Sequence, residues 1–119
     1  MRVSLPKLLL HIEGATVLVV SLLLYGQSGG NWLLFGLLVL APDLSMLGYL
    51  AGNSVGATVY DIVHTYPLPA ALAIYGWLSG NPLALQLALI WLAHIGADRM
   101  LGFGLKYPTG FRDTHLGRV

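Results

Sequence analysis

The sequence predicts an all-α protein, a bundle of four transmembrane helices followed by a short polar C-terminal tail. The first observation behind this prediction is composition, because the chain of 119 residues is 56% hydrophobic and only 9% charged. An ordinary soluble domain carries about 25% charged residues. Five acidic and six basic side chains cannot cover the surface of so short a chain. We therefore expect a single domain, residues 1–105, that lies in a lipid bilayer.

The second observation is the length of the apolar stretches, since a helix needs about 20 mainly apolar residues to cross a bilayer. Breaks rich in Gly, Asn and Ser separate these stretches, and at the last break Asn81 can cap a helix that Pro82 opens. The stretches are apolar all round rather than striped, which suits lipid better than the core of a soluble protein. The four expected spans are 5–25, 32–50, 55–78 and 82 to about 102 or 104.

The first stretch has two readings, a cleaved signal peptide or a membrane span. His11 and Glu13 interrupt its apolar run, and no small-x-small cleavage site follows Tyr25. A signal peptide has an uninterrupted apolar region and such a site. The span is therefore the favoured interpretation.

The third observation is the placement of the basic residues, which lie only toward the two ends of the chain. Four spans put both termini on one side of the membrane, and the two loops on the other side, near residues 26–31 and 79–81, carry no charge. Positively charged segments stay on the cytoplasmic side. We therefore expect a multi-pass protein with both termini in the cytoplasm. The basic residues are Arg2, Lys7, Arg99, Lys106, Arg112 and Arg118.

With this topology, ionisable residues from all four helices reach one level in the cytoplasmic half of the bilayer, about 6–15 Å from the helix ends. Intramembrane charges cost about 2.5–3.5 kcal/mol each on insertion scales, so these side chains should face inward. The i,i+3 and i,i+4 spacings within two of the helices place each pair on one helix face. The residues are His11, Glu13, Asp43, Asp61, His64, His94 and Asp98.

Prolines lie beside this level, at Pro42, Pro67 and Pro69. A proline in a helix releases the carbonyl one turn earlier, here near Leu38, Val63 and Thr65. Broken helices beside buried acids are typical of binding sites in membrane proteins.

Neutral imidazoles together with carboxylates are ligands for zinc, manganese or iron. We expect a divalent metal, with zinc as the leading candidate, held by Asp61, His64, His94 and Asp98. Two other interpretations stay open. The same residues can form a structural hydrogen-bonded network between helices, or a proton or ion pathway.

Further roles fall to residues around the expected metal. Asp43 is expected to be the general base, and Glu13 and His115 are expected to add acid–base groups to catalysis. The cytoplasmic tail, residues 106–119, is polar and contains a Pro/Gly turn. We expect it to pack as a cap, although a basic anchor on anionic lipid is the alternative. Its expected substrate-binding residues are Lys106, Arg112 and Asp113.

Several segments resemble a known family. They are Ala41-Pro-Asp-Leu-Ser-Met-Leu-Gly-Tyr, Tyr60-Asp-Ile-Val-His-Thr-Tyr, Trp91-Leu-Ala-His-Ile-Gly-Ala-Asp-Arg and the tail from Gly104 to Gly117. Over nearly the whole chain they resemble the small bacterial membrane proteins grouped as domain of unknown function 4260. The resemblance implies a short multi-span protein of the bacterial inner membrane, and it implies no activity.

These observations predict a metal-dependent membrane enzyme, a hydrolase of a lipid or amphiphilic substrate. The alternatives are a proton-coupled carrier of small solutes or an ion pathway, for which a homodimer would enclose more room, and a non-catalytic subunit of a membrane assembly. A net charge of +1 gives no reason to expect a nucleic-acid partner. The absence of cysteine excludes disulfides, thiolate metal sites and cysteine nucleophiles.

Overall fold

Helices make up nearly all of the computed structural model, which describes residues 4–102, 106–107 and 110–114. The all-α class predicted from the sequence is confirmed. The tail contributes two short antiparallel strands, in which Lys106 pairs with Thr114 and Tyr107 with Gly110. The elements are α1 (Leu5–Gln27), α2 (Trp32–Leu38), the 3₁₀ helix η1 (Ala41–Ala51), α3 (Asn53–Val63), α4 (Pro67–Ser79), α5 (Pro82–Leu101), β1 (Lys106–Tyr107) and β2 (Gly110–Thr114).

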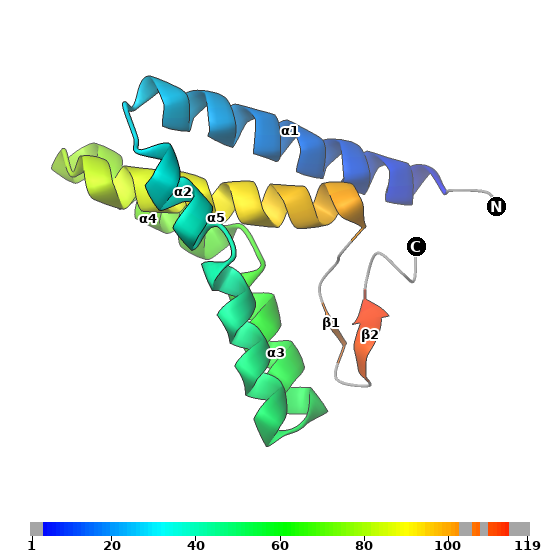
Figure 1. Ribbon diagram of the computed structural model, residues 1–119. Helices are drawn as coiled ribbons and strands as arrows, with labels where there is room; N and C mark the ends of the chain where they lie inside the picture. Colours follow the sequence, from blue (N-terminus) through cyan, green and yellow to red (C-terminus); the bar gives the residue numbers. More distant parts are fainter. Residues whose placement is uncertain (1–3, 103–105, 108–109, 115–119) are drawn as a thin grey trace.

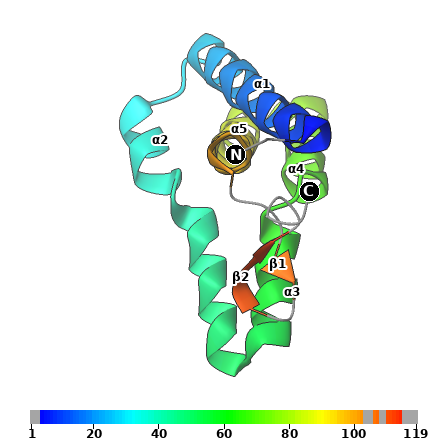
Figure 2. The same cartoon turned by 90° about the vertical axis from the view of Figure 1, so that its right-hand side faces the viewer.

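The helices form two parts (Figure 1). Helices α1, α4 and α5 lie alongside one another, and we call them the body. The 3₁₀ helix η1 and helix α3 form a hairpin, residues 41–63, which we call the arm and which points away from the body (Figure 2). Helix α2 leads from the end of α1 toward the arm, and the strand pair lies beside α3.

The helix boundaries follow from local capping. The side chain of Asn31 accepts a hydrogen bond from the backbone N–H of Leu33 at the start of α2. The side chain of Asn81 accepts one from Ala84 at the start of α5, so the expected cap with Pro82 in the first turn is confirmed. Gly80 ends α4 in the left-handed conformation, with φ +67°, which glycine adopts without a steric penalty.

The third expected span, 55–78, is two helices rather than one. Helix α3 ends at Val63 and α4 begins at Pro67. Pro67 has no N–H to donate to the carbonyl of Val63, and its ring crowds that carbonyl, so one continuous helix cannot form. The second expected span changes type near Pro42, where α2 gives way to η1.

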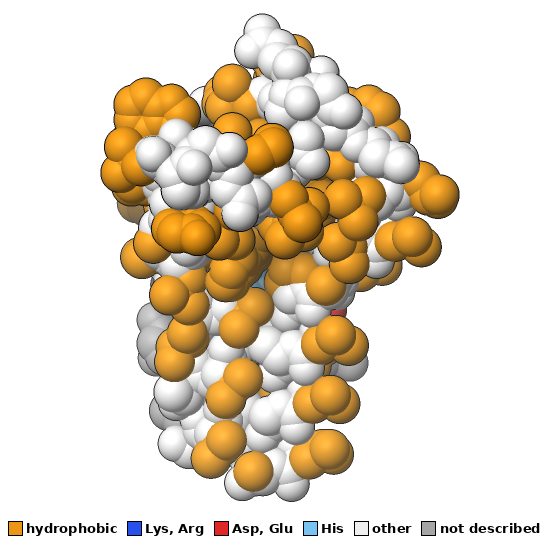
Figure 3. Space-filling model, turned by 90° about the vertical axis from the view of Figure 1, so that its left-hand side faces the viewer, with side chains coloured by type: hydrophobic (Ala, Val, Ile, Leu, Met, Phe, Trp, Pro, Cys, Tyr) orange, Lys and Arg blue, Asp and Glu red, His pale blue; other side chains and the backbone are white. Residues whose placement is uncertain are grey.

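Two helical segments of the described chain are long and apolar enough to cross a membrane, Leu5–Gln27 and Trp32–Ala51. Most of their apolar side chains are exposed; Leu33 and Leu37 each keep about 70% of their surface accessible. Hydrophobic side chains are spread over the face shown in Figure 3, from the body down along the arm. So much exposed apolar surface is unusual for a soluble monomer.

Helices α1 and α5 approach each other at two glycines. A Cβ atom on Gly96 would lie 2.7 Å from the backbone nitrogen of Leu18 and 2.8 Å from the carbonyl oxygen of Gly14. Both contacts are with backbone, which cannot turn aside as a flexible side chain can. The close crossing, which aligns α5 and its polar residues, therefore requires glycine at these positions.

We predict that Gly96→Ala lowers stability by about 1–3 kcal/mol, because the added methyl group forces the α1 backbone to move. Gly36 in α2 is the matched control, since a Cβ atom there would meet nothing within 4 Å. Gly36→Ala should leave stability unchanged or raise it by up to about 1 kcal/mol. Thermal unfolding of the detergent-solubilised protein measures both, and equal melting temperatures for the two variants would contradict the prediction.

Candidate metal centre

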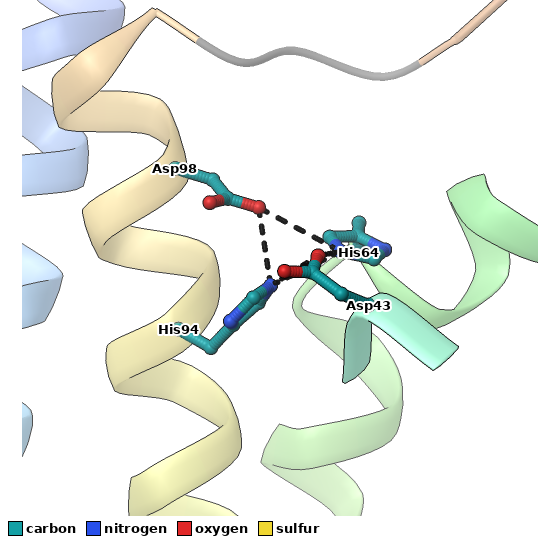
Figure 4. Close-up of side chains that lie close together, drawn as sticks. All are labelled: Asp43, His64, His94 and Asp98. Carbon is teal, nitrogen blue, oxygen red and sulfur yellow. Dashed lines mark hydrogen bonds and ion pairs between the residues drawn. The ribbon is translucent and has the colours of Figure 1, made fainter. Parts of the chain in front are cut away.

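Four polar side chains meet where the arm joins the body (Figure 4). Asp43, His64, His94 and Asp98 each offer one ligand atom, and these atoms all lie within 4.8 Å of one another. We call these residues the cluster. Asp43 lies in the first turn of η1, His64 follows the last residue of α3, and His94 and Asp98 occupy one face of α5.

The distances within the cluster are short. His64 Nε2 lies 3.2 Å from Asp43 Oδ1 and 3.6 Å from Asp98 Oδ2. His94 Nε2 lies 3.1 Å from Asp43 Oδ1 and 3.2 Å from Asp98 Oδ2. The two Nε2 atoms are 3.1 Å apart.

The hydrogen bonds of the two imidazoles fix which ring nitrogen carries a hydrogen. His64 Nδ1 lies 2.9 Å from the carbonyl oxygen of Tyr60, and His94 Nδ1 lies 2.6 Å from that of Val39. A carbonyl oxygen can only accept, so each Nδ1 must carry the hydrogen and donate it. In a neutral imidazole the Nε2 atom then presents a lone pair. When both imidazoles are neutral, two lone pairs and two carboxylate oxygens therefore face one another.

Such a group of acceptors requires a positive charge. A proton on one Nε2 atom would relieve the repulsion only between this nitrogen and the carboxylate oxygens beside it. A metal ion would contact all four atoms, and the Nδ1–H bonds to backbone carbonyls are the usual way in which proteins orient metal-binding imidazoles. The cluster could therefore hold a metal ion.

The dimensions fit a small ion. Zinc binds imidazole nitrogen at about 2.0–2.1 Å and carboxylate oxygen at about 2.0–2.2 Å, so tetrahedral ligand atoms lie about 3.3–3.6 Å apart. The five distances given above lie between 3.1 and 3.6 Å. The donor set, two imidazoles and two carboxylates, is one that zinc, manganese and iron accept.

The imidazoles are inside and the carboxylates are toward the surface. The side chains of His64 and His94 are 0% and 3% exposed, whereas those of Asp98 and Asp43 are 17% and 34% exposed. The ring of Tyr60 stacks on His64, with centroids 3.7 Å apart and planes 7° apart, and thus fixes the imidazole plane. Any exchange with solvent would take place on the carboxylate side.

The breaks in the helices supply the groups that hold the two histidines. In η1 the backbone N–H of Asp43 bonds to Leu40, as a 3₁₀ helix requires, which leaves the carbonyl of Val39 for His94. Trp91 donates its indole N–H to the carbonyl of Val63 at 2.7 Å, so the carbonyl that Pro67 releases is satisfied.

Arg99 is a second residue of α5 that holds the broken helix, and sequence reasoning missed it. Its guanidinium donates to the carbonyl of His64 at 2.7 Å, and the residue is only 6% exposed. From the sequence, Arg99 is expected only to be one of the basic residues near the predicted cytoplasmic side. Two features of the sequence indicate this role. Arg99 directly follows Asp98, and carbonyls near Val63 need a hydrogen-bond donor.

The structure assembles the expected residues differently from the sequence analysis. It brings His64, His94 and Asp98 together, but the fourth member of the cluster is Asp43, the expected base, and Asp61 is not part of it. The expectation for Asp61 assumed that helical spacing continues to His64. His64 instead lies beyond the end of α3, with φ −102° and ψ 21°, so the two residues no longer share a helix face.

The remaining expected residues lie away from the cluster or outside the described side chains. Glu13 is exposed on α1 and is not a member of the cluster. His115 lies outside the described residues, and only the backbone is described for Lys106, Arg112 and Asp113. That backbone belongs to the strand pair, which packs against α3.

Comparison with known proteins identifies the family. The family model described as domain of unknown function (DUF4260) matches residues 7–119, so the chain belongs to this family and the resemblance is confirmed. No curated protein and no solved structure matches the chain.

We predict that Trp91→Phe destabilises the protein by about 1–3 kcal/mol, because the carbonyl of Val63 loses the donor that satisfies it. Trp77→Phe is the matched control, since Trp77 is 72% exposed and its replacement should change stability by less than about 0.5 kcal/mol. Thermal unfolding in detergent compares the two. A Trp91→Phe protein as stable as the control would show that this hydrogen bond contributes nothing.

Proposed function

We propose that this chain is an integral membrane protein that binds one divalent metal ion at Asp43, His64, His94 and Asp98, with zinc as the best-fitting ion. We further propose that it uses this centre to hydrolyse a lipid or amphiphilic substrate. The observation that carries the proposal is the convergence of four possible ligand atoms, from three segments of the chain, within 4.8 Å of one another.

Charge balance supports a bound cation. Two carboxylates in a largely buried site carry two negative charges, which are expensive in a medium of low dielectric constant. The buried guanidinium of Arg99 interacts with Asp98 and offsets one of these charges, and a bound metal cation would offset the other. The same balance makes the site compatible with the interior of a membrane.

The difference in exposure among the four residues supports different roles for them. All four residues would hold the resting ion, and the less exposed members, His64, His94 and Asp98, would keep it when Asp43 is released. Asp43, the most exposed, would accept a proton at its carboxylate from an incoming water molecule, as a general base does. The metal would act as a Lewis acid that makes this water acidic and polarises the bond to be broken. Solvent and substrate would approach from the carboxylate side.

The apolar surface supports a membrane location. Two helical segments are apolar and long enough to span, and large hydrophobic side chains are exposed along the body and the arm. The basic residues near both ends of the chain support a multi-pass topology in the bacterial inner membrane with both termini in the cytoplasm. A protein in this position has lipids and other amphiphiles at hand as substrates.

One observation favours a second candidate, a non-catalytic assembly subunit with a structural metal. Structural zinc sites have four protein ligands, whereas catalytic sites have three and keep one position for water. The cluster has four members. The role of Asp43 therefore decides between the two candidates.

We predict that protein extracted from membranes with detergent and equilibrated with zinc retains about one zinc per chain, as expected of a single four-ligand site. His94→Ala should weaken zinc binding by at least about 10–100-fold, since it removes a ligand and not merely an outer contact. Elemental analysis and competition with a chromophoric chelator measure both quantities.

His11→Ala is the control for this experiment, because it removes an imidazole that lies outside the cluster, on α1. It should keep the zinc content of the unmodified protein. Zinc-free protein under these conditions, or equal zinc loss in both variants, would contradict the metal site. Recovery of the protein without detergent from the soluble fraction would contradict the membrane location.

We predict that Asp43→Asn retains zinc but slows hydrolysis by about 10²–10⁴-fold, because the amide cannot accept the proton. The assay supplies vesicles of phosphatidylethanolamine and phosphatidylglycerol in equal parts and measures released fatty acid and headgroup by mass spectrometry. Ser54→Ala, an exposed change on the arm, should alter neither quantity. Loss of zinc from Asp43→Asn to the extent seen for His94→Ala would instead favour the structural metal.

A further inference from the structure

We propose that the metal ion clamps the arm onto the body, so that the tilt of the arm depends on whether the site is loaded. This inference rests on the proposed metal site. The cluster takes one ligand from each end of the arm, Asp43 at the start of η1 and His64 directly after the last residue of α3. Its other two ligands, His94 and Asp98, come from α5 in the body.

Close packing occurs within each part of the molecule. In the body α1 and α4 both pack against α5, and in the arm η1 packs against α3. The two limbs of the arm fit closely, since a Cβ atom on Gly48 would lie 3.1 Å from Cβ of Val59 and one on Gly56 would overlap the ring of Tyr49. The arm is therefore built to move as a unit.

Three hydrogen bonds join α5 to the chain at or beside the two ends of the arm. Trp91 and Arg99 donate hydrogen bonds to the carbonyls of Val63 and His64, where the chain leaves α3. His94 donates to the carbonyl of Val39, just before η1. These bonds hold the two points at which the chain enters and leaves the arm, and they act as a hinge.

The ion changes the sign of the interaction beside this hinge. Without it, the carboxylates of Asp43 and Asp98 lie within 4.8 Å of each other and repel, and Asp43 has at most a single hydrogen bond to His94, over the 3.1 Å between its Oδ1 and Nε2. With the ion, both carboxylates and both imidazoles bind the same centre, and the start of η1 is drawn toward α5.

The 3₁₀ helix makes the arm easy to displace. It runs for 11 residues, although runs longer than 3–4 residues are uncommon because the hydrogen-bond geometry is poor. Its outer side chains have little to pack on, since Leu44 and Leu47 are about two-thirds exposed and Leu50 is 88% exposed. Little packing opposes a change of tilt at this limb.

The test measures the distance between arm and body with and without zinc. The chain has no cysteine, so a pair of introduced cysteines carries the only spin labels. The pair Leu50→Cys and Ile74→Cys reports the distance from the tip of the arm to α4. The pair Leu23→Cys and Ile74→Cys reports a distance within the body and is the control. All three positions are exposed. Pulsed electron paramagnetic resonance of the full chain in detergent gives both distance distributions, after loading with zinc and after chelation.

We expect the arm–body distribution to be narrow with zinc and to broaden and shift by about 4 Å after chelation, while the body pair stays unchanged. The 4 Å corresponds to a tilt of about 15° at the base of a helix of 11 residues. Zinc bound at one ion per chain with an unchanged arm–body distribution would overturn the clamp and leave the metal site standing. Equal broadening of the body pair would also overturn it, because the ion would then stabilise the whole fold. Failure to bind zinc would overturn the site and the clamp together.

Discussion

The structure depends on one electrostatic constraint, the meeting of two imidazole lone pairs and two carboxylates around a single point. Left alone, the two carboxylates, whose nearest oxygens lie within 4.8 Å of each other, repel, and the buried imidazoles beside them keep water from screening the repulsion. A metal cation bound at this point would replace the repulsion by attraction to a shared centre. The orientation of the histidines, the junction between the arm and the body, and the polar residues inside this otherwise apolar molecule all belong to this arrangement.

The irregularities of the helices are the means by which the chain meets this constraint. A regular helix uses every carbonyl internally and leaves none to orient a side chain. Where Pro42 and Pro67 interrupt the helices, the carbonyls of Val39 and Val63 become available, and they accept hydrogens from His94 and Trp91. The bond to Val39 orients His94, and the bond to Val63 holds the segment that carries His64. The breaks in these helices are therefore part of the site.

Much of this could be predicted from the sequence, because composition and helical rise depend on the chain alone. They indicate helices, and they bring His64, His94 and Asp98 to the same level. The choice between Asp43 and Asp61 could not be predicted, since it depends on the direction of the chain after α3 ends. Helical spacing relates Asp61 to His64 only while the helix continues, and it stops at Val63. The arm and the pairing of β1 with β2 are likewise set by tertiary packing, which periodicity does not report.

The gradient of exposure across the cluster links its chemistry to the motion of the arm. The two imidazoles are almost fully buried. Asp98 belongs to α5, which packs against both α1 and α4. Asp43 alone combines the greatest exposure in the cluster with a position on a 3₁₀ helix that has little to pack on. In the proposed metal centre, the ligand that would leave most easily is also the one whose departure would free the arm. In the proposed hydrolase, the group that takes the proton and the group that ties η1 to α5 are thus one carboxylate, so opening the arm and opening the metal to water are a single event.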